Sequence, residues 1–253
     1  MFTEAIIIRT RVHREHDLLV DCYTERAGRL NAVARGALRA GSVQGMHLDR
    51  GNLVRFEAVP GRGRPIITGA LARDSFVPVR SDLLRTAAVW VLMETVEVIV
   101  VGQERDDALW NFLSGSLRRI SACGTADVLP VLRSVQLGLL AILGYAPRTG
   151  ECAVCGAAPE GAGVFCIQLG GIVCPSCARA GWRGTHLAAE DIRWLSGRVA
   201  ESPFASVPRH TPAEELTEYV AGRPLRSLNV LFRVAARPGT PVPHAGTTAP
   251  GVV

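Results

Sequence analysis

Lysine is absent from this sequence of 253 residues, in which all 28 basic residues are arginine. Aromatic residues are also few, at 6% of the chain. The motifs of several enzyme classes are missing as well: there is no P-loop, no nucleophile elbow, no histidine pair for a catalytic metal and no glycine-rich dinucleotide fingerprint. These absences argue against the enzyme classes that the motifs define, and we expect a protein that is not an enzyme.

The sequence also has no long hydrophobic run. Its longest apolar stretch, residues 87–101, is short for a membrane span and contains Glu94 and Glu97. The first residues lack the basic region and the apolar run that together form a signal peptide. We therefore expect a cytoplasmic protein with no membrane partner.

Four of the seven cysteines fall in two C-x-x-C pairs, which form the most specific motif in the chain. Cys152 pairs with Cys155, and Cys174 with Cys177, with 18 residues between the pairs. Two intervening residues let a tight turn point both sulfurs at one place, and two such turns form a closed tetrahedral set of thiolates. We predict one structural Zn²⁺ per chain, bound by these four residues. Reduced thiols, disulfides or a thioredoxin-like motif at C-P-S-C are the alternative interpretations.

The residues around the cysteine pairs are typical of a small zinc ribbon, which we place at residues 150–181. Residues 164–169 and 172–173 resemble strands, and Gly170-Gly171 between them is a hairpin signal. Cys166 lacks a paired spacing, and Cys22 and Cys123 lie in apolar surroundings. Because three cysteines remain once the metal ligands are removed, the odd remainder favours a reducing compartment.

Positive charge is concentrated near the N-terminus. Residues 26–73 carry nine arginines against two acidic residues, a local net charge of +7. Such a patch is the pattern expected for binding a polyanion, and guanidinium groups suit phosphate because their forked donors bind two oxygens at once. The candidate contacts in and beside this region are Arg11, Arg14, Arg29, Arg35, Arg39, Arg50, Arg62 and Arg64.

Residues 1–79 have the pattern of a small β-barrel. Alternating or β-branched segments separated by turn residues predict strands at residues 3–10, 18–23, 29–34, 52–59 and 65–72. Five strands in so short a segment fit an oligonucleotide-binding (OB) fold. The aromatic residues of this segment are Phe2, Tyr23, Phe56 and Phe76, and we expect them in the core rather than as platforms for stacked bases.

After residue 79 the pattern becomes helical. Helices are predicted at residues 83–101, 106–121, 126–143, 188–200 and 225–235, with a further helix after the capping box that begins at Thr211. The predicted fold is therefore α+β and multidomain. Its parts are an OB-fold domain (1–79), a helical domain in two segments (80–149 and 182–236), the inserted ribbon (150–181) and a disordered tail (237–253).

Several short motifs accompany this order of parts. They are Glu15-x-Asp17, Thr24-x-x-x-Gly28, Ala34-Arg35-Gly36-Ala37 with Arg39 and Ser42, the ribbon cysteines, and Gly222-x-Pro224-Leu225-Arg226-Ser227. In these features residues 1–235 resemble the RecO family of bacterial recombination mediators. The resemblance singles out Arg35 and Arg39 as DNA contacts.

The resemblance to RecO implies a function without bond chemistry. Such a protein binds single- and double-stranded DNA at the nucleoid and anneals complementary strands. It engages the acidic C-terminal tail of the single-strand DNA-binding protein, and it joins RecR to help load RecA. The residues alone leave open a second interpretation, an RNA-binding factor of translation or RNA processing, because OB folds and zinc ribbons also occur there.

Overall fold

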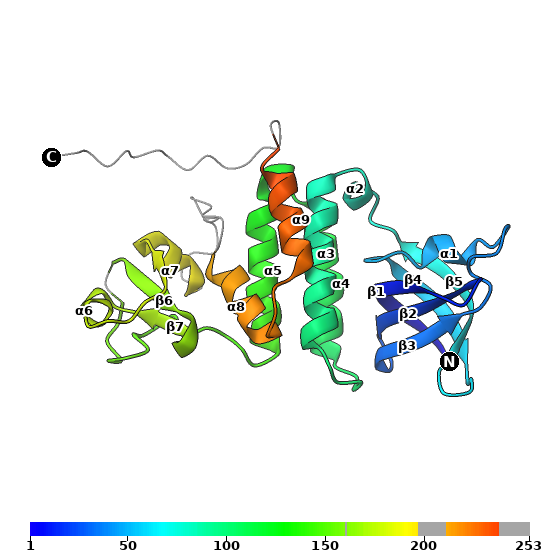
Figure 1. Ribbon diagram of the computed structural model, residues 1–253, viewed down its shortest axis with the longest axis horizontal. Coiled ribbons are helices and arrows are strands. Elements are labelled where there is room, and N and C mark those ends of the chain that lie inside the picture. The colour runs from blue at the N-terminus through cyan, green and yellow to red at the C-terminus, as the bar shows by residue number, and fades with distance from the viewer. Residues whose placement is uncertain (160, 197–210, 238–253) are drawn as a thin grey trace. The chain divides into compact units, whose positions relative to one another are not determined.

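The computed structural model of the chain describes residues 1–159, 161–196 and 211–237 (Figure 1). It divides into two compact units, the first formed by Met1–Cys123 with Leu225–Val234 and the second by Gly124–Pro224 with Ala235–Val253. The predicted tail at residues 237–253 and the end of the predicted helix at 188–200 lie almost entirely outside the described residues.

The first unit begins with five strands that close into a barrel in the order β1-β2-β3-β5-β4. The strands are β1 (Phe2–His13), β2 (Asp17–Thr24), β3 (Gly28–Ala34), β4 (Leu53–Val59) and β5 (Ile66–Asp74). All neighbours are antiparallel except β3 and β5, where Val33 and Ala34 lie beside Ile66 and Ile67. The predicted OB-fold barrel is confirmed.

Alternation along the strands builds the barrel core, since successive side chains point to opposite faces. Ala5, Ile7 and Val20 are fully buried, and Phe56 is 1% exposed. Tyr23 and Phe76 are also buried, as predicted, but Phe2 is half exposed with the Arg55 guanidinium 5.6 Å from its ring centre. A short helix, α1 (Gln44–His47), lies between β3 and β4 in a segment for which the sequence predicted no helix.

Helices complete the first unit: α2 (Val77–Arg80), α3 (Leu83–Ile99), α4 (Asp107–Ala122) and α9 (Arg226–Ala235). Asp82 caps α3 by accepting hydrogen bonds from the backbone N–H groups of Leu84 and Arg85, and Asp106 caps α4 in the same way. Ten residues of α3 are buried, which explains why its sequence is apolar on nearly every face.

Glu94, which we cited against a membrane span, is a buried cap. Its carboxylate accepts from the backbone N–H groups of Arg226 and Ser227, at 3.2 and 2.8 Å, and from the Ser227 hydroxyl at 2.6 Å. A carboxylate at a helix N-terminus satisfies donors that have no partner within the helix. The last two residues of the motif Gly222-x-Pro224-Leu225-Arg226-Ser227 thus tie the start of α9 to α3.

In the second unit, α5 (Val128–Ile142) follows the short turn η1 (Thr125–Asp127) and is joined by α7 (Ala189–Leu195) and α8 (Pro212–Ala221). Pro130 lies in the first turn of α5, the one place where a helix tolerates it. Among the described residues, Thr125–Ile142 is the one helical segment long and apolar enough to span a membrane, and half of it is buried. Its Arg133 forms a buried ion pair with Glu214 at 3.0 Å, as expected of a core helix.

The ribbon is a three-stranded sheet in the order β7-β6-β8, with β6 (Gly163–Cys166), β7 (Gly171–Val173) and β8 (Thr185–Leu187). Cys166 pairs with Gly171, so the connection is residues 167–170 and not the predicted Gly170-Gly171 turn. It includes the turn η2 (Ile167–Leu169), and Gly170 has a positive φ of 58°. β8 lies beyond the predicted ribbon and pairs with β6, and α6 (Pro175–Arg179) follows β7.

Candidate metal centre and nucleic-acid interface

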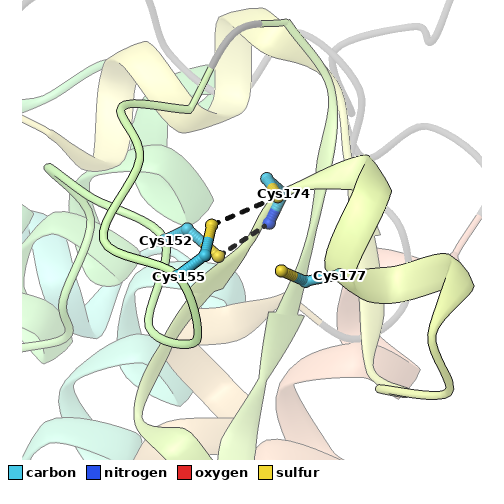
Figure 2. A group of neighbouring side chains, drawn as sticks. All are labelled: Cys152, Cys155, Cys174 and Cys177. Atoms are coloured by element: carbon cyan, nitrogen blue, oxygen red, sulfur yellow. Dashed lines mark hydrogen bonds between the residues drawn. The ribbon is translucent and has the colours of Figure 1, made fainter.

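The two cysteine pairs converge on one point (Figure 2). The four sulfurs of Cys152, Cys155, Cys174 and Cys177 all lie within 4.8 Å of one another, and those of Cys155 and Cys174 are 3.9 Å apart. A tetrahedral ion with metal–sulfur bonds of about 2.3 Å places its sulfurs about 3.8 Å apart. The four residues therefore form a group that could hold a metal ion, as their spacing predicted.

Backbone turns place the sulfurs. The first pair lies in a turn closed by a hydrogen bond from Gly156 N–H to the Cys152 carbonyl, and Gly156 has a positive φ of 73°. The second pair opens α6, where Cys174 is the N-cap and Cys177 lies one turn further on. The backbone N–H of Cys174 points at the Cys152 sulfur at 3.3 Å, so the two turns are joined directly.

The pKa values of Cys152 and Cys177 are shifted in opposite directions. Burial raises the pKa of Cys152, but the backbone N–H groups of Cys174, Cys155 and Val154 outweigh it and lower the pKa to about 6. Hydrogen bonds with Cys155 and Cys174, followed by burial, raise the pKa of Cys177 to about 12. Four thiolates packed this closely repel one another, so a cation must be present for all four to be charged together.

The remaining cysteines take no part in the group. All seven are free thiols, so the structure contains none of the disulfides that we weighed as an alternative. Cys166 is buried beneath the group with Val173, and its sulfur donates to the Gln168 side chain at 3.2 Å. Cys22 is buried in the barrel core, where burial raises the pKa of its thiol far above the usual range.

Two of the predicted DNA contacts, Arg29 and Arg50, are engaged inside the first unit. Arg29 forms a bidentate ion pair with Asp21, at 3.1 and 2.7 Å, and donates to the Glu97 carbonyl at 2.9 Å. Arg50 donates to the Ile8 carbonyl at 2.8 Å and pairs with the Glu97 carboxylate at 3.3 Å. These side chains fasten the barrel to α3, and we leave them out of the proposed interface.

The other predicted arginines are exposed and form no ion pair with any residue that the structure describes. They are Arg11, Arg14, Arg35, Arg39, Arg62 and Arg64, and Arg26, which our sequence analysis did not single out, shares these properties. The signal that could have found Arg26 is its place in the Glu25-Arg26-Ala27-Gly28 turn, since turn residues are seldom buried.

Hydrogen bonds between two loops bring the first four of these arginines to one end of the barrel. The Asp17 carboxylate accepts from the Gly36 N–H at 2.8 Å, and the His16 carbonyl accepts from the Leu38 N–H at 3.0 Å. The β1–β2 hairpin is thereby tied to the loop after β3. We call this end, with Arg11, Arg14, Arg35 and Arg39, the hairpin end.

The remaining arginines lie on two turns, Arg26 on the β2–β3 turn and Arg62 and Arg64 on the β4–β5 turn. The β4–β5 turn, with Arg62 and Arg64, shares a surface cavity with Ala27 and Leu30 at the start of β3, whereas the hairpin end adjoins the end of β3. We call this second group, with Arg26, the turn group. The Pro65 carbonyl, next to Arg64, accepts from the Val33 N–H at 2.9 Å, so the β4–β5 turn leads into β5 beside the end of β3.

The motif Thr24-x-x-x-Gly28 is structural. The Thr24 hydroxyl donates to the Gly28 carbonyl at 2.8 Å and accepts from the Ala27 N–H at 3.0 Å, which closes the β2–β3 turn. Gly28 has a positive φ of 66°, and a Cβ there would lie 2.2 Å from the Glu104 carbonyl oxygen. Only glycine fits this position.

An OB-fold barrel with exposed arginines, followed in the chain by helices and a four-cysteine group, defines a class of multidomain proteins that combine a small barrel with a candidate metal site. Comparison with known sequences identifies the family. The description "Recombination protein O N terminal" matches residues 1–76, and "Recombination protein O C terminal" matches residues 80–207. The chain belongs to the RecO family of DNA repair proteins.

Individual relatives are similar in sequence to this chain along most of their length. The DNA repair protein RecO of Roseiflexus sp. (strain RS-1) is 36% identical over 240 residues, which cover 90% of this chain and 84% of the relative. The RecO protein of Symbiobacterium thermophilum is 29% identical over 89% of this chain and 92% of its own length. That of Cutibacterium acnes is 32% identical over 76% of this chain and 79% of its own.

Proposed function

We propose that the chain is a recombination mediator that acts on DNA by binding alone. It anneals complementary single strands and, with RecR, helps load RecA onto DNA coated by the single-strand DNA-binding protein, whose acidic C-terminal tail it engages. Membership of the RecO family supports this proposal, together with the hairpin end of the barrel. The proposed place of action is the cytoplasm, at the nucleoid.

The observation that carries the proposal is the group of four exposed arginines at the hairpin end. Annealing requires that two phosphate backbones be neutralised together while the base edges stay free to pair. Guanidinium groups do this by displacing condensed counterions, so affinity falls steeply with salt. Arg35 and Arg39 lie on the loop that Asp17 holds in place, which fixes their positions relative to Arg14 on the neighbouring hairpin.

We also propose that the four-cysteine group binds one Zn²⁺. Cys152, Cys155, Cys174 and Cys177 would hold it as four thiolates, a set that suits this ion and leaves no open position for a substrate. When bound, the ion supplies a structural cross-link between the loop before β6 and the start of α6. Elemental analysis of protein purified without chelator should return one zinc per chain.

The test of function is annealing of two complementary DNA strands, each precoated with the cognate single-strand DNA-binding protein, followed by fluorescence without nucleotide. The wild-type chain should accelerate annealing. The double variant Arg35→Ala/Arg39→Ala should lose most of this acceleration, and the slope of log affinity against log salt for duplex DNA should flatten by about 1.8, at about 0.9 per phosphate contact.

The matched control is Arg55→Ala/Arg73→Ala. These two arginines are also exposed on the barrel, but both pair with the Glu4 carboxylate. The control should keep annealing and the salt slope close to those of the wild-type chain. Equal losses in both double variants would contradict a specific role for the hairpin end, and a preference for RNA over single-stranded DNA would favour the RNA-binding alternative.

A further inference from the structure

The ribbon carries a surface groove next to the metal centre that the proposed function does not use. It has a volume of about 660 Å³ and lies between α6 and the strands β6 and β8. Val164 and Leu187 form its buried apolar floor. Trp182, in the loop between α6 and β8, lines the groove and is 39% exposed. The volume is in the range of sites that bind small ligands or single groups of a larger one.

The loop that presents Trp182 is held by glycine on both sides. Gly181 has a positive φ of 116°, a conformation that favours glycine. At Gly184 a Cβ would lie 1.9 Å from the Phe165 carbonyl oxygen, so the backbone of the loop rests directly on β6. The sequence Gly181-Trp182-Arg183-Gly184 therefore fixes a large aromatic side chain at the surface, where an apolar residue without a partner is unfavourable.

The charge around the groove is positive. Arg179, Arg183 and His186 line it, and none of its lining residues is acidic. Both arginines are exposed, and neither forms an ion pair with a residue in the described parts of the chain. Two acidic groups lie beside the lining: Asp191 on α7 accepts from the Ala188 N–H at 3.1 Å, and Glu215 on α8 accepts from the Thr185 hydroxyl. Thr185 and His186 point to opposite faces of β8.

The barrel, by contrast, offers little for stacking. Tyr23, Phe56 and Phe76 are buried, and the half-exposed ring of Phe2 is covered on one side by the Arg55 guanidinium. Proteins that bind single strands combine a basic surface with aromatic side chains on which bases stack. The barrel supplies basic surface alone, whereas the ribbon groove is lined by an exposed indole and two arginines.

We propose that the ribbon groove is a second DNA contact that accepts single-stranded DNA, with one base stacked on the Trp182 indole and the flanking phosphates held by Arg179 and Arg183. The inference rests on the proposed DNA-binding function and assigns a separate task to each region. The barrel neutralises the phosphate backbones of both single-stranded and duplex DNA, and the ribbon distinguishes an unpaired base from a paired one. Bases inside a duplex are already stacked and cannot reach the indole.

The test compares the zinc-loaded full chain with its Trp182→Ala variant, using fluorescence anisotropy of a labelled oligothymidylate and of a blunt duplex of equal length. Trp182→Ala should weaken single-strand binding by about 5- to 100-fold, the range for loss of one stacked base, and leave duplex binding within about twofold. Trp182→Phe should retain most of the affinity. Arg179→Ala/Arg183→Ala should flatten the single-strand salt slope by about 1.4, at about 0.7 per phosphate.

Trp90→Ala is the matched control, because Trp90 is 40% exposed but lies on α3 in the first unit. It should bind both DNA forms like the wild-type chain. A second readout is tryptophan emission, which oligothymidylate should quench in the wild-type chain and much less in Trp182→Phe. Zinc content is measured for each variant. If Trp182→Ala loses its metal, the inference is judged instead on two results: the emission quenching of Trp182→Phe compared with the wild-type chain, and the salt slope of Arg179→Ala/Arg183→Ala.

Equal weakening of single-strand and duplex binding by Trp182→Ala would overturn the stacking role. Unchanged single-strand binding by Trp182→Ala would overturn the inference. If that variant also no longer binds a synthetic acidic peptide that the wild-type chain binds, the groove is assigned to a protein partner. These results are independent of the hairpin end: if Arg35→Ala/Arg39→Ala leaves annealing intact while Trp182→Ala weakens single-strand binding, the proposed function is wrong in its site but the groove assignment stands.

Discussion

The barrel and the ribbon are two small β structures of one chain, and each is stabilised internally in a different way. The barrel closes its sheet around a core of thirteen buried residues, from Ala5 on β1 to Ile67 on β5. The core cluster at the four cysteines contains three buried residues, Cys152, Cys166 and Val173, and Phe165 and Ile172 are buried elsewhere in the same short sheet. A closed barrel with such a core has its own driving force for folding, whereas a small sheet of short strands requires a cross-link.

The largest expected effect is therefore that of metal removal on the ribbon. Binding of a structural zinc by four cysteines contributes on the order of 10 kcal/mol of folding free energy to a small domain. In the variant Cys174→Ser/Cys177→Ser, or after treatment with a strong chelator, we expect the amides of β6 and β7 to lose their protection from hydrogen exchange. Mass spectrometry of exchanged peptides measures this.

The barrel provides the internal control for that experiment. Amides of β1, β2 and β3 should keep their protection without metal, because no residue of the barrel takes part in the cysteine group. If the ribbon strands stay protected after chelation, their own packing is sufficient and the comparison drawn above fails. If barrel amides are also released, the two regions do not fold independently.

The reverse experiment removes a barrel side chain. Phe56 is 1% exposed in the barrel core, so Phe56→Ala should destabilise the first unit by about 3–5 kcal/mol through lost burial and the cavity left behind. Hydrogen exchange in β1 and β4 should rise, while the zinc content should stay at one per chain. Leu71→Ala is the matched control, because Leu71 is 62% exposed on β5 and its truncation should change stability by less than about 0.5 kcal/mol.

Both regions could be predicted from sequence because their patterns are local. Period-two alternation and turn residues located the five strands of the barrel to within a few residues, and the C-x-x-C spacing located the four sulfurs. The helix predicted from residue 83 likewise begins at Leu83, as α3 does. In each case residues close in the chain determine the outcome, so a single sequence contains the whole signal.

The parts that could not be predicted depend on partners far apart in sequence. Arg9 and Arg50 meet Glu97 across 88 and 47 residues, so counting charge along the chain could not separate them from arginines that form no ion pair with the described residues. The pairing of β8 with β6 is of the same kind: Thr185–Leu187 is too short to show alternation, and its partner strand stabilises it. The hydrogen bonds that tie the β1–β2 hairpin, with Arg14, to the loop of Arg35 and Arg39 also join segments that a charge count does not connect.

Glu97 provides a test of how the barrel is attached to α3. Its carboxylate pairs with Arg9 at 2.6 Å and Arg50 at 3.3 Å and is 17% exposed. Glu97→Gln keeps the shape but removes the charge, so we expect the first unit to lose about 1–2 kcal/mol, with opening that begins at β1. Urea unfolding monitored by exchange in β1 measures this, and zinc content should not change.

Glu104→Gln is the control for that variant, because Glu104 is exposed and forms no ion pair with the described residues. It should leave the stability of the first unit unaltered. If both variants behave alike, the ion pairs of Glu97 contribute nothing to the attachment, and Arg50 returns to the set of candidate DNA contacts.

The smallest effect that we expect concerns Arg14, at the tip of the β1–β2 hairpin. Arg14 has a positive φ of 58°, which is unfavourable for a residue with a Cβ. Arg14→Gly and Arg14→Ala remove the same charge, but only glycine relieves the backbone, so the glycine variant should be more stable than the alanine variant by about 1 kcal/mol. Both should flatten the duplex salt slope equally, by about 0.9. Equal stabilities would show that the hairpin relaxes without glycine, and unequal slopes would show that its conformation, as well as its charge, positions the DNA.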